Sequence, residues 1–520
     1  MTAVLRPARG LGVSPVLAAS LAAFAWLAFT IGLRPLNLPE EGRYVGIAWE
    51  MLRSGNWLIP TEDGLPFFHK PPLFYWLTAG SMQVFGSNAA AARLAPLLGA
   101  AVGAIGLYRV ARHWAGERTA RWSMLVLVTA PFFFAGAQFA NLDMLVAGFM
   151  ALSVVLAGHA ALLLKTGRPH RSVLVGAWAA AAFGVLAKGL IGVVLPGLVL
   201  VVWLLVTRQA RTILALLSLP GLAAFVLITV PWFAAVQMQY PGFAHYFFVY
   251  QHVERFAAGG FNSVQPWWFF LAAVPLLTLP WSLWLVRSTV RARPGESAQA
   301  TLWRQLMWAW LSIVVVFFSI PQSKPVGYSM PVLFPLAALV ADAVVARLGA
   351  GSARTRQAAL ASAGVAVALC LGAVAYSSAT YDRDNTALAR TLARLRAPAD
   401  PVVFVDEYFF DIPLHARLAE PVPVISDWQD PAIARRDNWR RELAEAAPFA
   451  PALAATVLVD AQRGLALRCG TAPLWAVVKS DGEAAVAALP GATRAALSNR
   501  VALWRVAPAD CAGGGKAVPQ

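Results

Sequence analysis

The first three quarters of the chain alternate between long apolar runs and short polar connections. Runs of about 17 to 25 apolar residues are long enough to cross the hydrocarbon core of a bilayer as helices. The first run is too long for the core of a signal peptide and lacks a small-residue cleavage site, so we expect it to be retained. The pattern predicts eleven spans, at residues 11–33, 90–110, 118–135, 142–164, 171–187, 189–206, 211–235, 264–286, 301–319, 326–346 and 356–376.

The cationic residues indicate how these spans are oriented. They cluster in alternate connections, at 6–9, 109–121, 165–171, 208–211, 287–304 and 347–356. By the positive-inside rule these connections and the N-terminus are cytoplasmic. The connections 34–89, 136–141, 237–263 and 320–325 and the short break at Lys188 are then external, and an odd number of spans places everything after residue 376 outside as well.

The composition agrees with a membrane protein. Of the 520 residues 59% are hydrophobic and only 13% are charged, which is too few charges for a surface that faces water everywhere. The formal net charge of +16 is spread over short clusters rather than along one continuous stripe. We therefore expect membrane lipids around the chain and no nucleic-acid partner.

The pattern changes after residue 376. Apolar runs shrink to strand length at 402–405, 422–425, 456–459, 475–478 and 501–506, with helical patterns at 386–395 and 438–446 between them. This predicts a membrane domain at 1–376, a soluble α/β domain at 377–510 and a disordered, Gly-rich tail at 511–520. Cys469 and Cys511 are both external and are either paired or free, whereas Cys370 is expected to pack inside the last span.

Two adjacent acids, Glu40 and Glu41, follow the first span. Carboxylates beside a bilayer are costly unless they face water, a cation or a substrate, which indicates a functional site. The alternative is a helix start, since acids are favourable at the positive end of a helix. The amphipathic segments 44–53 and 73–85 are too short to span and are rich in aromatic residues, so we expect them to lie at the interface and to flank a pocket.

The external segment 237–263 combines imidazoles, cations and aromatic rings. His245, His252 and Arg255 stand beside several tyrosines and phenylalanines. This mixture suits a ligand that carries phosphate or sugar. The chain has no Walker-type phosphate loop, so ATP-driven transport has no motif to support it. It also has no Cys-x-x-Cys motif.

Several short motifs of the chain resemble those of one enzyme family and occur in the same order. The motifs are Leu-Pro-Glu-Glu-Gly-Arg-Tyr at 38–44, Phe-Phe-His-Lys-Pro-Pro at 67–72, Asn-Leu-Asp-Met at 141–144, His-Val-Glu-Arg-Phe at 252–256 and Ser-Lys at 323–324. Over about residues 10–345 the chain is similar to the bacterial aminoarabinose transferases. These belong to the GT-C glycosyltransferases, which include the protein O-mannosyltransferases.

The resemblance implies a fold, a reaction and a location. The fold is an all-α polytopic membrane protein of GT-C type, with about 11–13 transmembrane helices and interfacial helices in the first external loop, plus the C-terminal soluble α/β domain. The reaction is transfer of a sugar from a polyprenyl-phosphate donor to a lipid A-type or other envelope acceptor. It takes place on the periplasmic face of a bacterial inner membrane, where no nucleotide sugar is available.

The resemblance also implies roles for the acids. Glu40 stands where the family usually has Asp and is the first candidate for the base on the acceptor side, with Glu41 as the second. Asp143 matches another family acid, and its alternative role is a helix N-cap. Arg43 and Tyr44 are expected to hold the acceptor or to support the acids.

Cations are expected to take up the charge of the leaving phosphate. The candidates are Lys70, Lys188, Arg255 and Lys324 with Tyr328. Their alternatives are a solvated loop lysine for Lys70, a side chain that snorkels to the interface for Lys188, and interface anchoring for Lys324 and Tyr328.

His69 replaces a family Glu. A histidine there can bind zinc together with His245 or His252, or it can lie at the interface without a ligand, with the cations alone holding the phosphate. Because Glu40 and His69 both depart from the family pattern, the sugar and the acceptor stay undecided.

Three other functions remain open. The acceptor can be a protein, as in the O-mannosyltransferases, the chain can be a transporter of lipid-linked sugar, or it can be an inactive relative. Transporters place ionisable residues near the midplane of the bilayer and often contain repeated halves. Here the charges of interest lie in external loops and at outer helix ends, which favours an enzyme.

Overall fold

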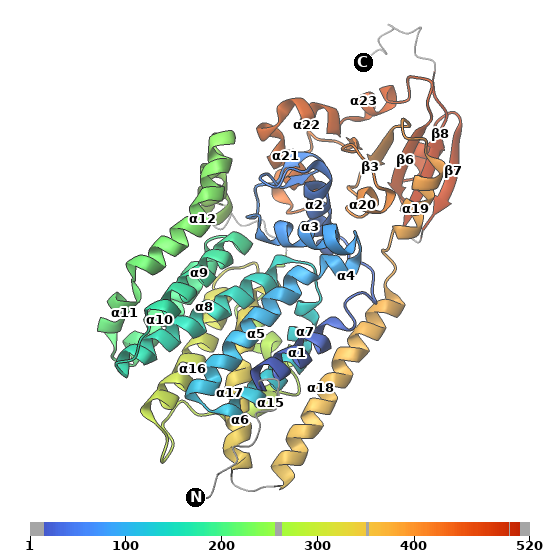
Figure 1. Cartoon of the computed structure of the whole chain (residues 1–520). Coiled ribbons are helices and arrows are strands. Elements are labelled where there is room, and N and C mark those ends of the chain that lie inside the picture. Colours follow the sequence, from blue (N-terminus) through green and yellow to red (C-terminus); the bar gives the residue numbers. More distant parts are fainter. Residues whose placement is uncertain (1–14, 255–262, 350–352, 499, 510–520) are drawn as a thin grey trace, which may run out of the picture.

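The computed structural model describes residues 15–254, 263–349, 353–498 and 500–509. A large helical bundle carries a smaller α/β domain at one end, and the first external loop lies between the two (Figure 1). The predicted fold class is confirmed. The elements of the bundle are α1 (Pro15–Ala28), α5 (Leu94–Trp114), α6 (Glu117–Thr129), α7 (Pro131–Ala137), α8 (Leu142–Lys165), α9 (Arg171–Lys188), α10 (Ile191–Val206), α11 (Ala210–Leu216), α12 (Leu219–Gln239), η1 (His245–Glu254), α14 (Phe269–Leu277), α15 (Ser282–Leu285), α16 (Ala298–Ser319), η2 (Val326–Val332), α17 (Leu333–Leu348) and α18 (Ala353–Thr380).

Each of the eleven predicted spans corresponds to helix, although not always to one straight helix. Within the described residues, 7 helices are long and apolar enough to cross a membrane, or 8 if the pair α6 and α7 forms one span. This pair bends by 68° where Pro131 begins α7, because proline cannot continue the hydrogen-bond ladder of the preceding helix. Helices α1 and α10 are shorter, and the predicted span 264–286 is divided into α14 and α15. The number of such helices is that of a multi-pass membrane protein.

Close packing of α5 against α8 positions one part of the site. A Cβ atom added to Gly148 would lie 1.9 Å from the carbonyl oxygen of Gly99, so only glycine allows the two backbones to approach this closely. Small residues at helix crossings are a general means of packing within membranes. The crossing fixes the outer end of α8, where Asp143 lies.

The first external loop folds into α2 (Glu40–Ser54), β1 (Thr61–Glu62), β2 (Leu65–Pro66), α3 (Leu73–Phe85) and α4 (Ala89–Ala92). The predicted interfacial segments 44–53 and 73–85 are therefore helical. Glu50 of α2 organises the hairpin between β1 and β2, since its carboxylate accepts hydrogen bonds from the backbone N–H groups of Asp63 (2.8 Å) and Gly64 (3.0 Å).

The C-terminal domain is built on a six-stranded mixed sheet in the order β5-β4-β3-β6-β8-β7. The first four of these strands are parallel, and β8 and β7 are antiparallel to their neighbours. Alternate residues of β3 fall into separate buried clusters, Phe404 in one and Val403 in the other, so both faces of the sheet are covered. The elements are α19 (Thr386–Leu395), β3 (Val402–Val405), α20 (Ile412–Ala416), β4 (Val424–Ile425), η3 (Ile433–Arg435), α21 (Trp439–Ala446), η4 (Ala447–Phe449), α22 (Pro451–Val457), β5 (Leu458–Val459), α23 (Ala461–Ala466), β6 (Leu474–Lys479), α24 (Ala484–Ala487), β7 (Ala492–Leu497) and β8 (Val501–Val506).

The predicted strands are present, and β7 is an additional strand that the pattern did not indicate. Its residues alternate poorly and are mostly exposed or half-buried, so it carries no clear hydrophobic signal. Cys469 is disulfide-bonded, and Cys370 is buried and free. Cys511 and the predicted tail 511–520 lie outside the described residues.

Candidate active site

Six of the predicted residues meet at the end of the bundle that faces the soluble domain, and we call this group the outer site. The side chains come from the start of α2, the start of α8, the end of α9 and from η2. They are Glu40, Arg43, Tyr44, Asp143, Lys188 and Tyr328.

Lys188 and Asp143 form an ion pair in the outer site. Asn141, rather than Asp143, caps α8, because the Asn141 side chain accepts a hydrogen bond from the Asp143 backbone N–H at 3.0 Å. The Nζ atom of Lys188 also lies 4.4 Å from the centre of the Tyr328 ring, within the range of a cation–π contact. A Cβ atom on Gly327 would lie 1.9 Å from Asp143 Oδ2, so the glycine leaves room for the carboxylate.

Glu40 lies in the first turn of α2 with its side chain 42% exposed. Its Oε2 atom accepts a hydrogen bond from Arg43 Nη2 at 2.9 Å. The same guanidinium lies 4.8 Å from the centre of the Tyr44 ring. Glu40 is also close enough to Lys188 for their charges to interact. An accessible carboxylate held by an arginine can meet a substrate.

Glu41 has a different environment, although it is the next residue. Its side chain is fully buried, and its two oxygens accept five hydrogen bonds: two from Arg93 (2.8 Å each) and one each from Arg34 (2.8 Å), the Asn37 N–H (2.8 Å) and the Ala140 N–H (2.7 Å). Burial alone would raise the pKa of Glu41, but the hydrogen bonds and charges of Arg93 and Arg34 outweigh it and lower this pKa. The carboxylate thus joins α2 to α5 and to the start of α8.

Among the other predicted phosphate ligands, Lys324 is held by backbone carbonyl groups. Lys324 is buried, and its ammonium group donates to the backbone carbonyl of Gln265 at 2.9 Å and to that of Pro321. It thereby holds two external segments together. Lys70 is half-buried beside His69, and Arg255 lies outside the described residues.

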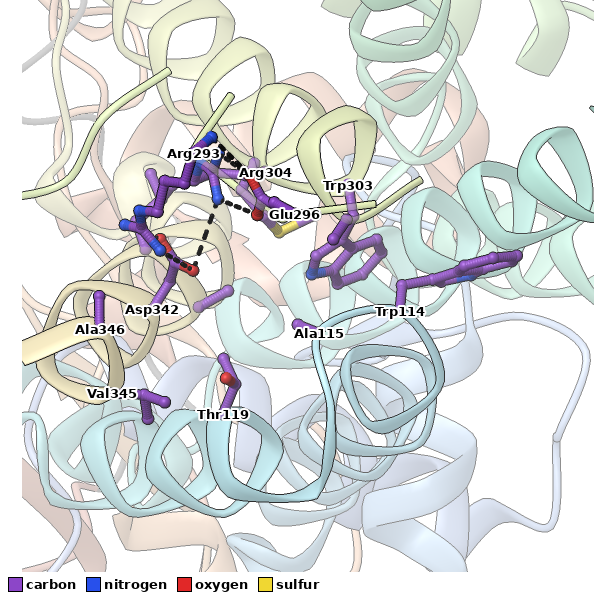
Figure 2. Close-up of a pocket in the computed structure, with 14 residues that line it drawn as sticks. Trp114, Ala115, Thr119, Arg293, Glu296, Trp303, Arg304, Asp342, Val345 and Ala346 are labelled. Atoms are coloured by element: carbon purple, nitrogen blue, oxygen red, sulfur yellow. Dashed lines mark hydrogen bonds and ion pairs between the residues drawn. The ribbon is translucent and has the colours of Figure 1, made fainter. Parts of the chain in front are cut away.

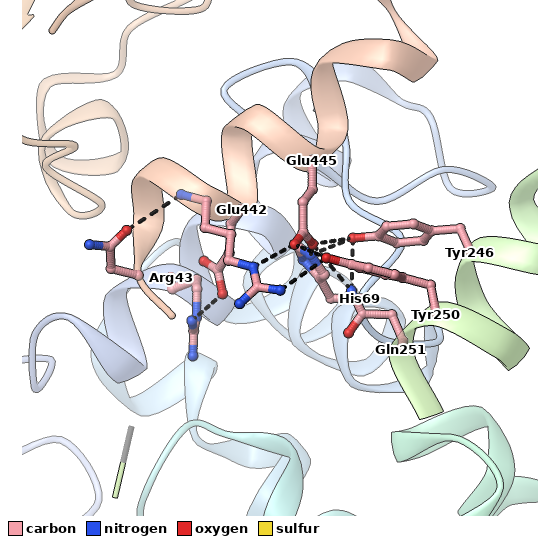
Figure 3. A network of polar contacts seen from close by, with 9 residues as sticks. Arg43, His69, Tyr246, Tyr250, Gln251, Glu442 and Glu445 are labelled. Carbon is pink, nitrogen blue, oxygen red and sulfur yellow. Dashed lines mark hydrogen bonds and ion pairs between the residues drawn. The ribbon is translucent and has the colours of Figure 1, made fainter. Parts of the chain in front are cut away.

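A second polar network joins the first external loop to α21 of the soluble domain (Figure 3). His69 Nε2 lies 3.1 Å from Glu445 Oε2 and 2.6 Å from the hydroxyl of Tyr246. The Tyr246 hydroxyl donates to Glu445 Oε2 at 2.8 Å, and the Tyr250 hydroxyl donates to Glu445 Oε1 at 2.7 Å. Glu445 therefore contacts both the first external loop, through His69, and η1, through Tyr246 and Tyr250.

This network bears on the predicted zinc site. His69 is occupied by Tyr246 and Glu445, and His245 is exposed on η1. Across the described part of the chain there is no group of three or more His, Cys, Asp or Glu residues that could hold a metal ion. The side chain of His252 lies outside the described residues.

Three acids near the outer site were not predicted from the sequence, namely Glu62, Glu442 and Glu445. Glu442 Oε1 lies 2.5 Å from Arg43 Nη1. Glu62 is buried in β1, and neither of its carboxyl oxygens has a hydrogen-bond partner among the described residues. Burial, followed by the charge of Glu442, raises the pKa of Glu62 well above its usual range.

A separate cavity of about 260 Å³ lies at the opposite end of the bundle (Figure 2). Its charged side chains pair with one another: Arg304 Nη1 lies 2.5 Å from Glu296 Oε1, and Arg293 Nη2 lies 2.7 Å from Asp342 Oδ2. The charge pattern predicts that this end of the bundle is cytoplasmic. The pairs share no residue with the outer site.

Comparison with known families identifies related proteins. Residues 69–234 match the family described as dolichyl-phosphate-mannose-protein mannosyltransferase. Over 347 residues the chain is 35% identical to undecaprenyl phosphate-alpha-4-amino-4-deoxy-L-arabinose arabinosyl transferase of Pseudomonas aeruginosa PAO1 and 34% identical to that of strain LESB58. Each match covers 66% of this chain and 61% of the relative, so the chain spans about three fifths of the length of these relatives.

Solved structures extend the likeness to nearly the whole chain. ArnT from Cupriavidus metallidurans bound to undecaprenyl phosphate has a TM-score of 0.78 at 25% identity, covering 96% of this chain and 99% of that chain. An oligosaccharyltransferase of Archaeoglobus fulgidus, at 12% identity and a TM-score of 0.51, covers 89% of this chain and 69% of its own and shows a shared fold alone. In sequence and in structure, this chain is therefore similar to the aminoarabinose transferases, which are membrane proteins of the GT-C type.

Proposed function

We propose that the protein transfers an aminoarabinose-type sugar from a polyprenyl phosphate to lipid A or a similar envelope acceptor. The observation that carries the proposal is the outer site, in which an accessible carboxylate, Glu40, lies beside an ion pair between Lys188 and Asp143. The matched transferases are named for an undecaprenyl phosphate-linked donor, and one structural neighbour contains undecaprenyl phosphate. These likenesses support the choice of donor.

Glu40 is the proposed base. An acceptor hydroxyl gives its proton to the Glu40 carboxylate while its oxygen attacks the anomeric carbon of the sugar, and the bond from that carbon to the phosphate oxygen breaks. Arg43 restricts the position of the carboxylate through the contact at 2.9 Å. Such positioning matters, because a misplacement of about 1 Å can cost on the order of a hundredfold in rate.

Lys188 is the proposed cation for the departing phosphate. The leaving group gains negative charge as the bond breaks, and a positive group already in place stabilises that charge. Asp143 and the ring of Tyr328 hold the ammonium of Lys188 in position before the donor arrives. Lys70 and Arg255 stay further candidates for the same phosphate, whereas we propose that Lys324 secures the external segments and that Glu41 is structural.

The proposed orientation places the N-terminus in the cytoplasm and the domain after residue 376 in the periplasm. The alternation of basic connections supports it. The soluble domain also covers the same end of the bundle as the outer site (Figure 1). Acceptor, donor head group and soluble domain then share one side of the membrane, as the reaction requires.

A protein acceptor is the second candidate, because the matching family profile is that of a protein mannosyltransferase. The two acceptors are distinguished by an assay in liposomes. We expect purified protein to add sugar from undecaprenyl phosphate-linked aminoarabinose to lipid A, detected by mass spectrometry. Glu40→Gln should lower the rate about 10²-fold or more. Glu420→Gln, which makes the same change at an exposed position of the soluble domain, is the control.

Two results would overturn this proposal. One is an unmodified lipid A together with sugar on an envelope protein, which would name the protein acceptor. The other is a Glu40→Gln variant as active as Glu420→Gln, which would move the base to another residue, with Asp143 as the next candidate.

A further inference from the structure

Helix α21 of the soluble domain presents one charged side to the first external loop. Arg441, Glu442 and Glu445 are three or four residues apart in the pairs 442/445 and 441/445, a spacing that places side chains on neighbouring positions of a helix surface. Figure 3 shows Glu442 directed toward Arg43 and Glu445 directed toward His69. The two carboxylates therefore contact different parts of the loop.

The contact of Glu442 leads directly to the outer site. Glu442 Oε1 lies 2.5 Å from Arg43 Nη1, and these side chains are 10% and 20% exposed. The other terminal nitrogen of the same guanidinium, Nη2, donates to Glu40 Oε2 at 2.9 Å. Because the guanidinium is planar and rigid, fixing one of its nitrogens restricts the position of the other. Arg43 is thus a bridge between a carboxylate of the soluble domain and the proposed base.

We propose that Glu442 is a positioning residue of the active site, which sets the orientation of Arg43 and through it that of Glu40. The inference rests on the proposed function, in which Glu40 is the base. The soluble domain then contributes to the geometry of the active site. Without the Glu442 carboxylate, the Arg43 side chain is free to turn toward Glu40 or away from it.

The neighbouring acid supports this assignment. Glu62 also lies close enough to Arg43 for their charges to interact, but it is buried beside Glu442. Of the two acids, Glu442 contacts the Arg43 guanidinium directly, whereas neither carboxyl oxygen of Glu62 has a hydrogen-bond partner among the described residues.

The docking of the soluble domain does not depend on Glu442 alone. Glu445 holds η1 through Tyr246 and Tyr250. The ring of Phe449 packs against Phe68 at a centroid distance of 4.9 Å, and the N–H of Val422 donates to Asp63 Oδ1 at 2.7 Å. A change confined to the Glu442 carboxylate should therefore leave the domain in place, which allows positioning to be separated from folding.

The test uses the isosteric variant Glu442→Gln in the purified full-length protein. We expect kcat for transfer from undecaprenyl phosphate-linked aminoarabinose to fall about tenfold to a hundredfold, while KM for the donor stays within about twofold. Glu420→Gln should retain the kcat of the wild type. If Glu442 acts through Arg43, adding Glu442→Gln to an Arg43→Gln variant should lower kcat no further, because coupled residues are not additive.

The outcomes separate this inference from the proposed function. An active wild type whose kcat is unchanged by Glu442→Gln, or a double variant whose losses multiply fully, would overturn the positioning role. A wild type that transfers no sugar would overturn the proposed function instead. The contact between Glu442 and Arg43 is then tested by thermal unfolding of the two single variants and the double variant. If the stability losses of Glu442→Gln and Arg43→Gln simply add in the double variant, the contact is overturned, whereas a clear departure from additivity supports it.

Discussion

Replacing Glu41 by glutamine should damage the fold, whereas the same change at Glu40 should damage the reaction. The two residues are adjacent in the first turn of α2, but Glu41 is fully buried and Glu40 is 42% exposed. Glu41 is the counter-charge of Arg93, which is itself fully buried, and of Arg34. The Glu41→Gln variant would leave both guanidinium groups without this charge and would turn an amide N–H₂ group toward other donors.

The structure allows the size of this effect to be worked out. Removing one partner of a buried ion pair costs about 3–5 kcal/mol, because the remaining charge stays buried without compensation. At roughly 2 °C per kcal/mol, the value for larger domains, the unfolding temperature should fall by about 6–10 °C. Glu40→Gln loses a single, more exposed contact to Arg43 and should unfold within about 2 °C of the wild type.

Thermal unfolding of the purified proteins in one detergent measures the difference, and transfer assays on the same preparations measure activity. Glu40→Gln is the matched control, since it makes the identical chemical change one residue away. A Glu41→Gln variant as stable as Glu40→Gln would refute the reasoning. If that stable variant were also inactive, Glu41 rather than Glu40 would be the catalytic acid.

Three further predictions concern other parts of the chain. Lys188→Met should lower kcat/KM for the lipid-linked donor about 10²-fold, because it removes the proposed phosphate cation. Lys165→Met, at an exposed helix end, is the control. If both variants change kcat/KM equally, Lys188 is not the phosphate cation. Burial raises the pKa of Asp411 from 3.8 to about 6, so the stability that its protonated form provides is present below about pH 4 and is lost as the pH rises through 6. Relative to Asp411→Asn, the wild type should therefore lose about 2 kcal/mol of unfolding free energy between pH 4 and pH 7, and parallel stability curves would contradict the shift. A reporter that is active only outside the cytoplasm should work when fused after residue 380 and fail near residues 168 and 293, and the opposite result would invert the proposed orientation.

The hydrophobic pattern was sufficient to predict where the bundle is helical, because long apolar runs indicate segments that are buried in lipid. Each of the eleven predicted spans contains helix within the described residues, although only 7 or 8 of these helices are long and apolar enough to cross a membrane, and segments 44–53 and 73–85 lie in helices α2 and α3. What the pattern did not reveal is where spans break. Pro131 separates α6 from α7 with a bend of 68°, but a proline at the start of a helix and one that interrupts a span look alike in an apolar run.

The distinction between Glu40 and Glu41 also required the structure. Successive residues of an α-helix point about 100° apart, so one of two adjacent acids can face the interior while the other faces water. The sequence does not show which, because the answer depends on Arg93 and Arg34, which approach from other segments.

The contacts of the soluble domain were beyond sequence reasoning for a different reason. Glu442 and Arg43 are separated by 399 positions, and Glu445 and His69 by 376. Local patterns carry no information about such pairs. The helical pattern at 438–446 predicts the helix α21, but it does not indicate what the polar side chains of that helix contact.

The most direct test of the central claim is a reconstitution with three components. Purified protein, undecaprenyl phosphate-linked aminoarabinose and lipid A are combined in liposomes, and the lipids are analysed by mass spectrometry with Glu40→Gln in parallel. The account predicts lipid A that carries one added aminoarabinose in the wild-type sample and about a hundredfold less in the variant. Lipid A that stays unmodified by the wild type, or that is modified equally by Glu40→Gln, would contradict it.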